Sequence, residues 1–305
     1  MTEYVRTKDL ISFDVEIAEV IADDAWDDVE REDLSITCAA TSLLGEGVLP
    51  WYPMTNTIPH QPMDRQIDPV TLGAMCTIIE GYVEEGFSVL TWNGCSFDFP
   101  VVIGNLAEDS EHRERMARIC FENHVDLGFM MVCQLGYMAK LEAMAHVLGL
   151  VGKTPGMSGK YAPPLWADTS SGASAELIAE AEAMTGLRCG TREAQEFCIE
   201  YVTRDVEATK DLGRELEQWI LAALSGPVIG EAPGLRWITN KGTLSKAKWT
   251  PQSFVLTDKS DVLFPTVQQC LRSIPEPKWP KGRRGKYYSW LSKYPTVRSK
   301  YLVVE

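Results

Sequence analysis

The sequence predicts an α/β domain built on a mixed β-sheet that is flanked by helices. Two observations support this fold class. Three short segments with strand character, residues 10–17, 35–44 and 48–52, follow one another near the start of the chain. A later segment, residues 87–92, is short and almost entirely apolar, which is typical of a strand covered on both faces. Apolar residues at helical spacing before and after that segment supply the covering layers.

The first three strands are predicted to form an antiparallel meander. Residues 10–17 combine an apolar run with alternation, and residues 35–44 are apolar and small. Gly45-Glu46-Gly47 makes a turn into the third strand. Between the first two strands, residues 23–33 hold seven carboxylates in eleven residues, and we interpret this stretch as a solvated loop.

The helices follow from apolar spacing and from helix-start signals. Asp68-Pro69 places proline in the first turn of a helix whose apolar positions are Leu72, Met75, Cys76, Ile79 and Val83. Further helices are predicted at residues 98–106, 111–123, 135–150 and 192–224. Residues 153–174 are rich in Gly, Pro and Ser and are predicted to form a long loop, a feature that is often functional.

The composition is that of an ordinary globular protein, with 45% apolar and 24% charged residues. No run of eighteen apolar residues occurs, so no membrane span is expected. The first residues lack a secretory pattern, and the eight cysteines form no CxxC pair, which together indicate a reduced, cytoplasmic protein without a zinc site. The four histidines form no metal-binding pair, and we interpret them as structural or surface residues.

The charge is divided between two parts of the chain. Residues 1–225 contain 15 Lys and Arg against 38 Asp and Glu, whereas residues 226–305 contain 14 against 5. We therefore predict a domain over residues 1–224 and a basic, aromatic-rich extension over residues 225–305. Cationic side chains interleaved with Trp and Tyr suit a single nucleic-acid strand. The alternative is that the extension packs on the acidic domain.

A pair of carboxylates lies on the first predicted strand. Asp14 and Glu16 are two residues apart, so their side chains point to the same face. Two anions this close repel each other unless a cation lies between them. Oxygen ligands without His or Cys nearby favour Mg²⁺ or Mn²⁺ over zinc.

Two further segments carry candidate carboxylates. In Trp92–Pro100, Asn93-Gly94 permits a sharp turn with positive φ, and Asp98 follows where a covered strand leads into a helix. The alternative for Asp98 is a helix N-cap. Tyr201 and Asp205 are one turn apart on the last helix, so they share one helix face. The alternative there is a packed tyrosine and a surface aspartate.

Taken together, these segments resemble the DEDD exonucleases. The motifs are Phe13-Asp14-Val15-Glu16, Asn93-Gly94-x-x-Phe97-Asp98-x-Pro100 and Tyr201-x-x-x-Asp205, and the tyrosine is that of the Tyr-type branch. The sequence around Asp126-Leu127 and residues 148–153 is also similar to exonucleases related to the proofreading domain of family-B polymerases. The resemblance covers about residues 8–215 and implies a ribonuclease-H-like fold.

By this resemblance, the chain is a 3′→5′ exonuclease that releases nucleoside 5′-monophosphates from the 3′ ends of single-stranded DNA or RNA. Two divalent ions, Mg²⁺ or Mn²⁺, would be held by the four carboxylates. Asp14 would bind both ions, Glu16 and Asp205 one of them, and Asp98 the other, while Tyr201 would orient the attacking water. Two alternatives remain: a non-catalytic nucleic-acid-binding module of the same fold, and a ribonuclease-H-type endonuclease.

Substrate contacts are expected from the motifs, from the predicted loop and from the basic extension. The candidates are Asn93, Phe97, Lys153, Lys160, Arg283 and Arg284. Phe97 or Phe99 would stack on the terminal base, with burial in the core as the alternative.

Overall fold

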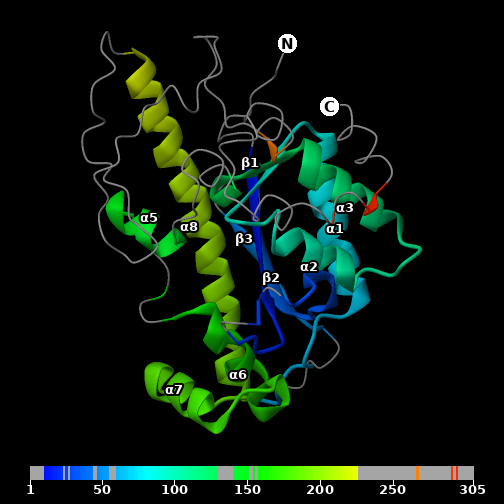
Figure 1. Ribbon diagram of the computed structural model, residues 1–305, viewed down its shortest axis with the longest axis vertical. Helices are drawn as coiled ribbons and strands as arrows, with labels where there is room; N and C mark the ends of the chain where they lie inside the picture. Colours follow the sequence, from blue (N-terminus) through cyan, green and yellow to red (C-terminus); the bar gives the residue numbers. More distant parts are fainter. Residues whose placement is uncertain are drawn as a thin grey trace.

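A computed structural model of the chain describes residues 10–22, 25–26, 28–43, 47–54, 60–129, 140–150, 154, 157–225, 266–267, 290 and 293–294. Its centre is a five-stranded sheet in the order β3-β2-β1-β4-β5 (Figure 1). The strands are β1 (Leu10–Ile17), β2 (Ile36–Ser42), β3 (Val48–Trp51), β4 (Ser88–Thr91) and β5 (His124–Asp126).

The sheet is mixed, and β1 lies at its centre. β1 pairs antiparallel with β2, and β2 pairs antiparallel with β3. β4 pairs parallel with β1 on its other side and with β5. The predicted fold class and the antiparallel meander are therefore confirmed. β5 was not predicted, because a three-residue strand is too short to show a period.

Helices cover both faces of this sheet, as Figure 1 shows. On one side lie α1 (Pro69–Glu84), α2 (Asp98–Asn105) and α3 (Glu111–Glu122), and the buried side chains of these helices join the main apolar core. On the other side, the long helix α8 (Arg192–Ser225) packs on β1 and β2. The Asp68 side chain caps α1 by accepting hydrogen bonds from the N–H groups of Val70 and Thr71, as the Asp-Pro signal predicted.

The predicted loop over residues 153–174 is wrong where the structure describes it. Residues 159–171 form a 3₁₀ turn, helix α6 (Ala162–Ala167) and a second 3₁₀ turn, η4 (Asp168–Ser171). Prolines start α6, and its Leu165 and Trp166 side chains are buried in a second apolar cluster. The Gly/Pro-rich composition led to the wrong prediction because proline is common both in loops and in the first turn of a helix.

Two other helices refine the predictions. α7 (Ala175–Thr185) was not predicted; Ser174 caps its start, and Gly186 ends it with φ +71°. Within the predicted helix 135–150, the structure describes the part from residue 140 onward, where α5 spans Leu141–Val147.

Several histidines and cysteines have structural roles, as expected. His112 pairs with the Glu80 carboxylate at 2.6 Å. His124 is fully buried, and this burial lowers its pKa to about 3, so the ring is neutral. The six cysteines within the described residues are buried, and none of them forms a disulfide. In the same part of the chain, helices that combine the length and the apolarity required to cross a bilayer do not occur.

Candidate metal centre

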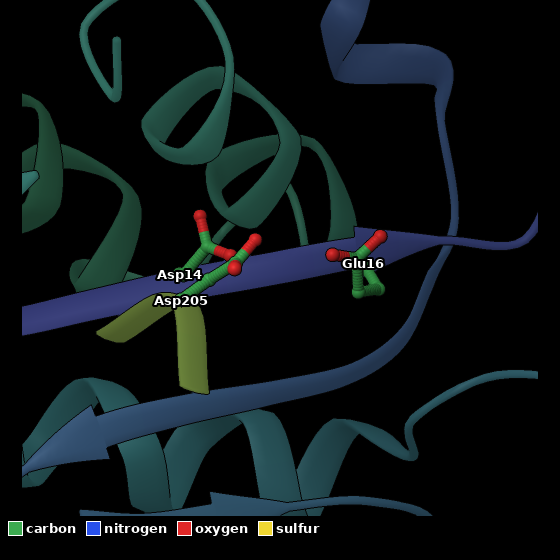
Figure 2. A group of neighbouring side chains, drawn as sticks. All are labelled: Asp14, Glu16 and Asp205. Atoms are coloured by element: carbon green, nitrogen blue, oxygen red, sulfur yellow. The ribbon is translucent and has the colours of Figure 1, made fainter. Parts of the chain in front are cut away.

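Three carboxylates meet between β1 and α8. Asp14 and Glu16 come from β1 and Asp205 from α8, and one oxygen of each lies within 4.8 Å of the others. Figure 2 shows the Asp205 carboxylate beside that of Asp14, with Glu16 further along the strand. Small residues of β2, Ala40 and Cys38, are the register partners of the two β1 carboxylates, so this face of the sheet leaves room for them.

Asp205 is buried rather than exposed, with 2% of its surface accessible. The alternative of a surface aspartate is therefore wrong. One turn earlier, Tyr201 is equally buried, and its hydroxyl is hydrogen-bonded to the Asp205 carboxylate. Burial, followed by the charges of Glu16, Asp205 and Asp14, raises the pKa of Tyr201 far above its usual value. The hydroxyl consequently keeps its proton at every working pH.

The fourth carboxylate, Asp98, does not belong to this group of three, but it lies beside Asp14 from the start of α2, just after the turn that follows β4. The β1–β4 ladder ends at the Ser12–Leu90 pair, so β1 continues beyond its neighbour. The N–H of Val15, in that extended part, donates to Oδ1 of Asp98 at 3.1 Å. Asp98 thus takes a position that a longer β4 would have filled, beside Asp14.

The N-cap alternative for Asp98 is wrong. α2 begins at Asp98 itself, and no side chain caps that end. The Asp98 carboxyl instead forms a hydrogen bond with the Asp14 carboxyl. Burial raises the pKa of Asp98, although the hydrogen bonds with Asp14 and Val15 partly oppose this shift. A hydrogen bond between two carboxyl groups requires one proton, so the half-buried Asp14 and the buried Asp98 together carry less than two negative charges.

The turn between β4 and α2 fits the predicted Asn-Gly signal. Asn93 has φ 72°, a left-handed conformation that asparagine tolerates. Gly94 is required for a different reason, because a Cβ there would lie 2.3 Å from Oγ1 of Thr91. The Gly94 N–H donates to that same hydroxyl at 2.9 Å. The Thr91 hydroxyl also contacts Nε2 of the neutral His124 at 2.8 Å.

Asp126, at the end of β5, stabilises this turn through hydrogen bonds to its main chain. It was not predicted as a site residue. Its carboxylate accepts hydrogen bonds from the N–H groups of Asn93, Cys95 and Phe129 at 2.8–2.9 Å. Burial raises the pKa of Asp126 to about 6, and these hydrogen bonds limit the rise. Its role depends on β5 lying beside β4, a pairing that local sequence patterns do not encode.

The predicted substrate contacts are dispersed. The Asn93 side chain accepts a hydrogen bond from the Ser96 hydroxyl at 2.5 Å and so serves the turn. Phe97 is half-buried and contacts Trp26 edge-on, at 6.1 Å between ring centroids. Lys160 forms an exposed ion pair with Glu180 at 3.2 Å.

Phe99 is fully buried and packs edge-on against Phe13, with ring centroids 5.1 Å apart. Its assignment to base stacking is therefore wrong, because a ring in the core cannot reach a nucleotide. The other three candidates, Lys153, Arg283 and Arg284, lie outside the described residues.

Comparison with known families agrees with this geometry. A family model described as the RNase H superfamily matches residues 65–216. This chain has a ribonuclease-H-like fold. The matched segment includes Asp98 and Asp205. It begins after the three antiparallel strands and so does not include Asp14 and Glu16, whose positions in the site come from the structure alone. A search of curated proteins found no match.

The ribonuclease-H-like fold together with an acidic cluster is typical of metal-dependent nucleases, and domains of this fold bind nucleic acids. The donor atoms fit such a metal. Asp14, Glu16 and Asp205 offer carboxylate oxygens, which suit a divalent cation with hard-ligand preference. Asp98 adds a further carboxylate beside Asp14.

Proposed function

We propose that the chain is a 3′→5′ exonuclease of the Tyr-type DEDD branch, acting on the 3′ ends of single-stranded DNA or RNA. One observation carries the proposal: the carboxylates of β1 and α8 meet, the Asp98 carboxyl at the start of α2 is bonded to one of them, Asp14, and the hydroxyl of Tyr201 is bonded to another, Asp205. The segments that supply them lie far apart in the sequence, and a fold without metal chemistry has no need of so many buried acids in one place.

The proposed metal ligands divide into two groups that share Asp14. Asp14, Glu16 and Asp205 would hold one Mg²⁺ or Mn²⁺ ion, and Asp14 with Asp98 would hold a second. When bound, the ions would supply activation of a water molecule and stabilisation of the leaving 3′-oxygen. The proton between Asp14 and Asp98 would leave when the carboxylates bind metal, because a ligating carboxylate is deprotonated.

Tyr201 would orient the attacking water rather than remove its proton. Its raised pKa keeps the phenol protonated, and its hydroxyl is fixed by Asp205. Because the single proton of the phenol is donated to Asp205, its oxygen can accept a hydrogen bond from the attacking water. This tyrosine beside the α8 carboxylate favours the exonuclease over a ribonuclease-H-type endonuclease. Phe97, half-buried at the turn, is retained as the candidate for stacking on the terminal base.

A ladder assay tests the proposal. Single-stranded DNA and RNA oligonucleotides of matched sequence, labelled at the 5′ end, would be incubated with the full chain and Mg²⁺ or Mn²⁺. We expect products that shorten one nucleotide at a time from the 3′ end, with nucleoside 5′-monophosphates released. Internal fragments at early times would instead indicate an endonuclease. A gel shift without cleavage would indicate the non-catalytic binding module.

A further inference from the structure

The indole of Trp290, in the basic extension, lies against the turn that carries Asp98. Its Nε1 donates a hydrogen bond of 2.8 Å to the carbonyl oxygen of Cys95, which is 195 residues away in sequence. Only 7% of Trp290 is exposed, and its side chain belongs to the main apolar core together with Cys95. This contact is therefore part of the folded domain.

The peptide groups of Cys95 are held on both sides by distant side chains. Its N–H donates to Oδ2 of Asp126 at 2.9 Å, and its carbonyl accepts from Trp290. Cys95 lies three residues before Asp98, in the same turn. The N–H belongs to the peptide plane before the Cα of Cys95 and the carbonyl to the plane after it, so each of the two successive planes is restrained by one bond. Together the two bonds limit where α2 can begin and where the Asp98 carboxylate can point.

Two neighbouring residues of the extension, Lys293 and Tyr294, make further contacts close to Trp290 and α2. Lys293 forms an ion pair with Glu32, and the Tyr294 ring packs edge-on against Trp290 at 6.1 Å. Glu32 in turn lies against α2, because a Cβ at Gly104 would be 1.9 Å from the Glu32 carbonyl oxygen. Trp290, Lys293 and Tyr294 therefore pack on the acidic domain, which was the alternative to nucleic-acid binding for the extension. Residues 23–33 were expected to form a solvated loop, and for Glu32 this prediction is wrong because the residue packs against α2.

We propose that Trp290 is a positioning residue for the metal centre, acting through the Cys95 carbonyl on Asp98. Trp290 would then help to position a proposed metal ligand, whatever contact the basic residues of the extension make with substrate. This inference rests on the proposed role of Asp98 as a metal ligand. Loss of an outer partner of a metal ligand lowers metal affinity by about 10- to 100-fold, and an effect near the lower limit is expected here because Trp290 acts through the backbone.

The matched control is Trp166, another buried tryptophan, whose Nε1 donates to the Asp64 carbonyl oxygen at 3.1 Å. It belongs to the second apolar cluster, whereas Cys95 belongs to the first. Trp290→Phe and Trp166→Phe each remove one indole N–H from a main-chain carbonyl. A general loss of stability is therefore common to both variants, and an effect on the ion that depends on Asp98 is expected of Trp290→Phe alone.

The experiment measures Mn²⁺ binding to the full-length protein without nucleic acid, by calorimetry, with thermal unfolding measured in parallel. Trp290→Phe should raise the Kd for the ion that depends on Asp98 about tenfold, while Trp166→Phe leaves it at the wild-type value. Saturating Mn²⁺ should restore kcat of Trp290→Phe in the nuclease assay. Lys293→Gln, which loosens the same segment without altering the core, should raise the Kd by a smaller factor.

Asp98→Asn separates failure of this inference from failure of the proposed function. If Asp98→Asn weakens Mn²⁺ binding but Trp290→Phe and Lys293→Gln bind it as the wild type does, the Trp290 inference is wrong and the metal centre stands. If Asp98→Asn also binds Mn²⁺ normally, both the assignment of Asp98 and the inference built on it are wrong.

Discussion

Two carboxylates of the candidate metal centre, Asp205 and Asp98, are positioned by different kinds of structure. Asp205 is carried by α8, a helix of 34 residues whose regular backbone fixes its direction and its spacing from Tyr201. Asp98 follows a tight turn whose shape depends on side chains from elsewhere, among them Asp126 and Trp290. A ligand on a long helix is thus positioned by local structure, whereas a ligand after a turn is positioned by tertiary contacts. The two should respond differently to distant substitutions.

The largest effect is expected from the carboxylates that the two proposed metal sites share or depend on. Asp14→Asn or Asp205→Asn should lower the rate by about 10³-fold or more, since metal ions contribute several kcal/mol to such reactions. The measurement is single-turnover cleavage of an end-labelled oligonucleotide, with folding checked by circular dichroism.

Glu80→Gln is the matched control for those variants. Glu80 is also a buried carboxylate, but it binds Arg115 at 3.0 Å and His112 between α1 and α3. Its amide variant should lose stability and keep the cleavage rate. Equal losses of rate in all three variants would mean that the carboxylates matter for folding and not for metal binding.

A smaller effect is expected at the helix-borne tyrosine. Tyr201→Phe should lower kcat by about 10- to 1000-fold, the range for one positioned catalytic group, with Mn²⁺ affinity unchanged. Tyr161→Phe is its control, because Tyr161 also donates its hydroxyl to a carboxylate, that of Glu180, at 3.3 Å on the surface. If Tyr201→Phe retained the wild-type rate, its hydroxyl would have only a packing role.

Asp126→Asn tests whether tertiary contacts of the turn position Asp98. The amide keeps one acceptor oxygen, so at least one N–H of the turn loses its partner, at a cost of about 1–3 kcal/mol. We expect the Mn²⁺ affinity that depends on Asp98 to fall about tenfold. The affinity of the site formed with Asp205 should change less. A uniform fall at both sites would contradict the separation drawn between turn and helix.

The sequence predicted the parts of the centre that depend on local spacing. The alternation that pairs Asp14 with Glu16 and the helical interval from Tyr201 to Asp205 are properties of single elements, and the structure brings these residues together. The Asn-Gly turn was also predicted, because its backbone demands particular residues.

The missing parts depend on pairing between distant segments. β5 is a strand because Val125 pairs with Leu90, and three residues alone have no strand signal. Asp126 acquires its role only from that pairing. The aromatic and basic pattern around Trp290 suggested nucleic-acid binding, but the same residue types also bury well, and only the fold decides between these two uses.

The last effect expected is a pH dependence of the folding stability at Asp126, which concerns neither the cleavage rate nor the metal affinity. Its pKa in the folded, metal-free protein is about 6, above the usual value of 3.8 for an aspartate. A raised pKa means that the folded state binds the proton more tightly, so this group favours folding at low pH and that contribution declines as pH rises from about 4 to 6. Asp126→Asn removes the titration, and His124 contributes equally to both proteins. The stability of wild type relative to the variant should fall by about 1–3 kcal/mol between pH 4 and pH 7. A difference that stays constant would show that Asp126 ionises as readily in the fold as in the unfolded chain.

The most direct test of the metal centre is a crystal structure of the full chain with Mn²⁺, in which anomalous scattering locates the ions. The convergence of β1, α2 and α8 predicts one ion bound by Asp14, Glu16 and Asp205, and a second bound by Asp14 and Asp98. Mn²⁺ found only at other acidic groups of the surface, with the four carboxylates bound to no ion at saturating metal, would contradict the account.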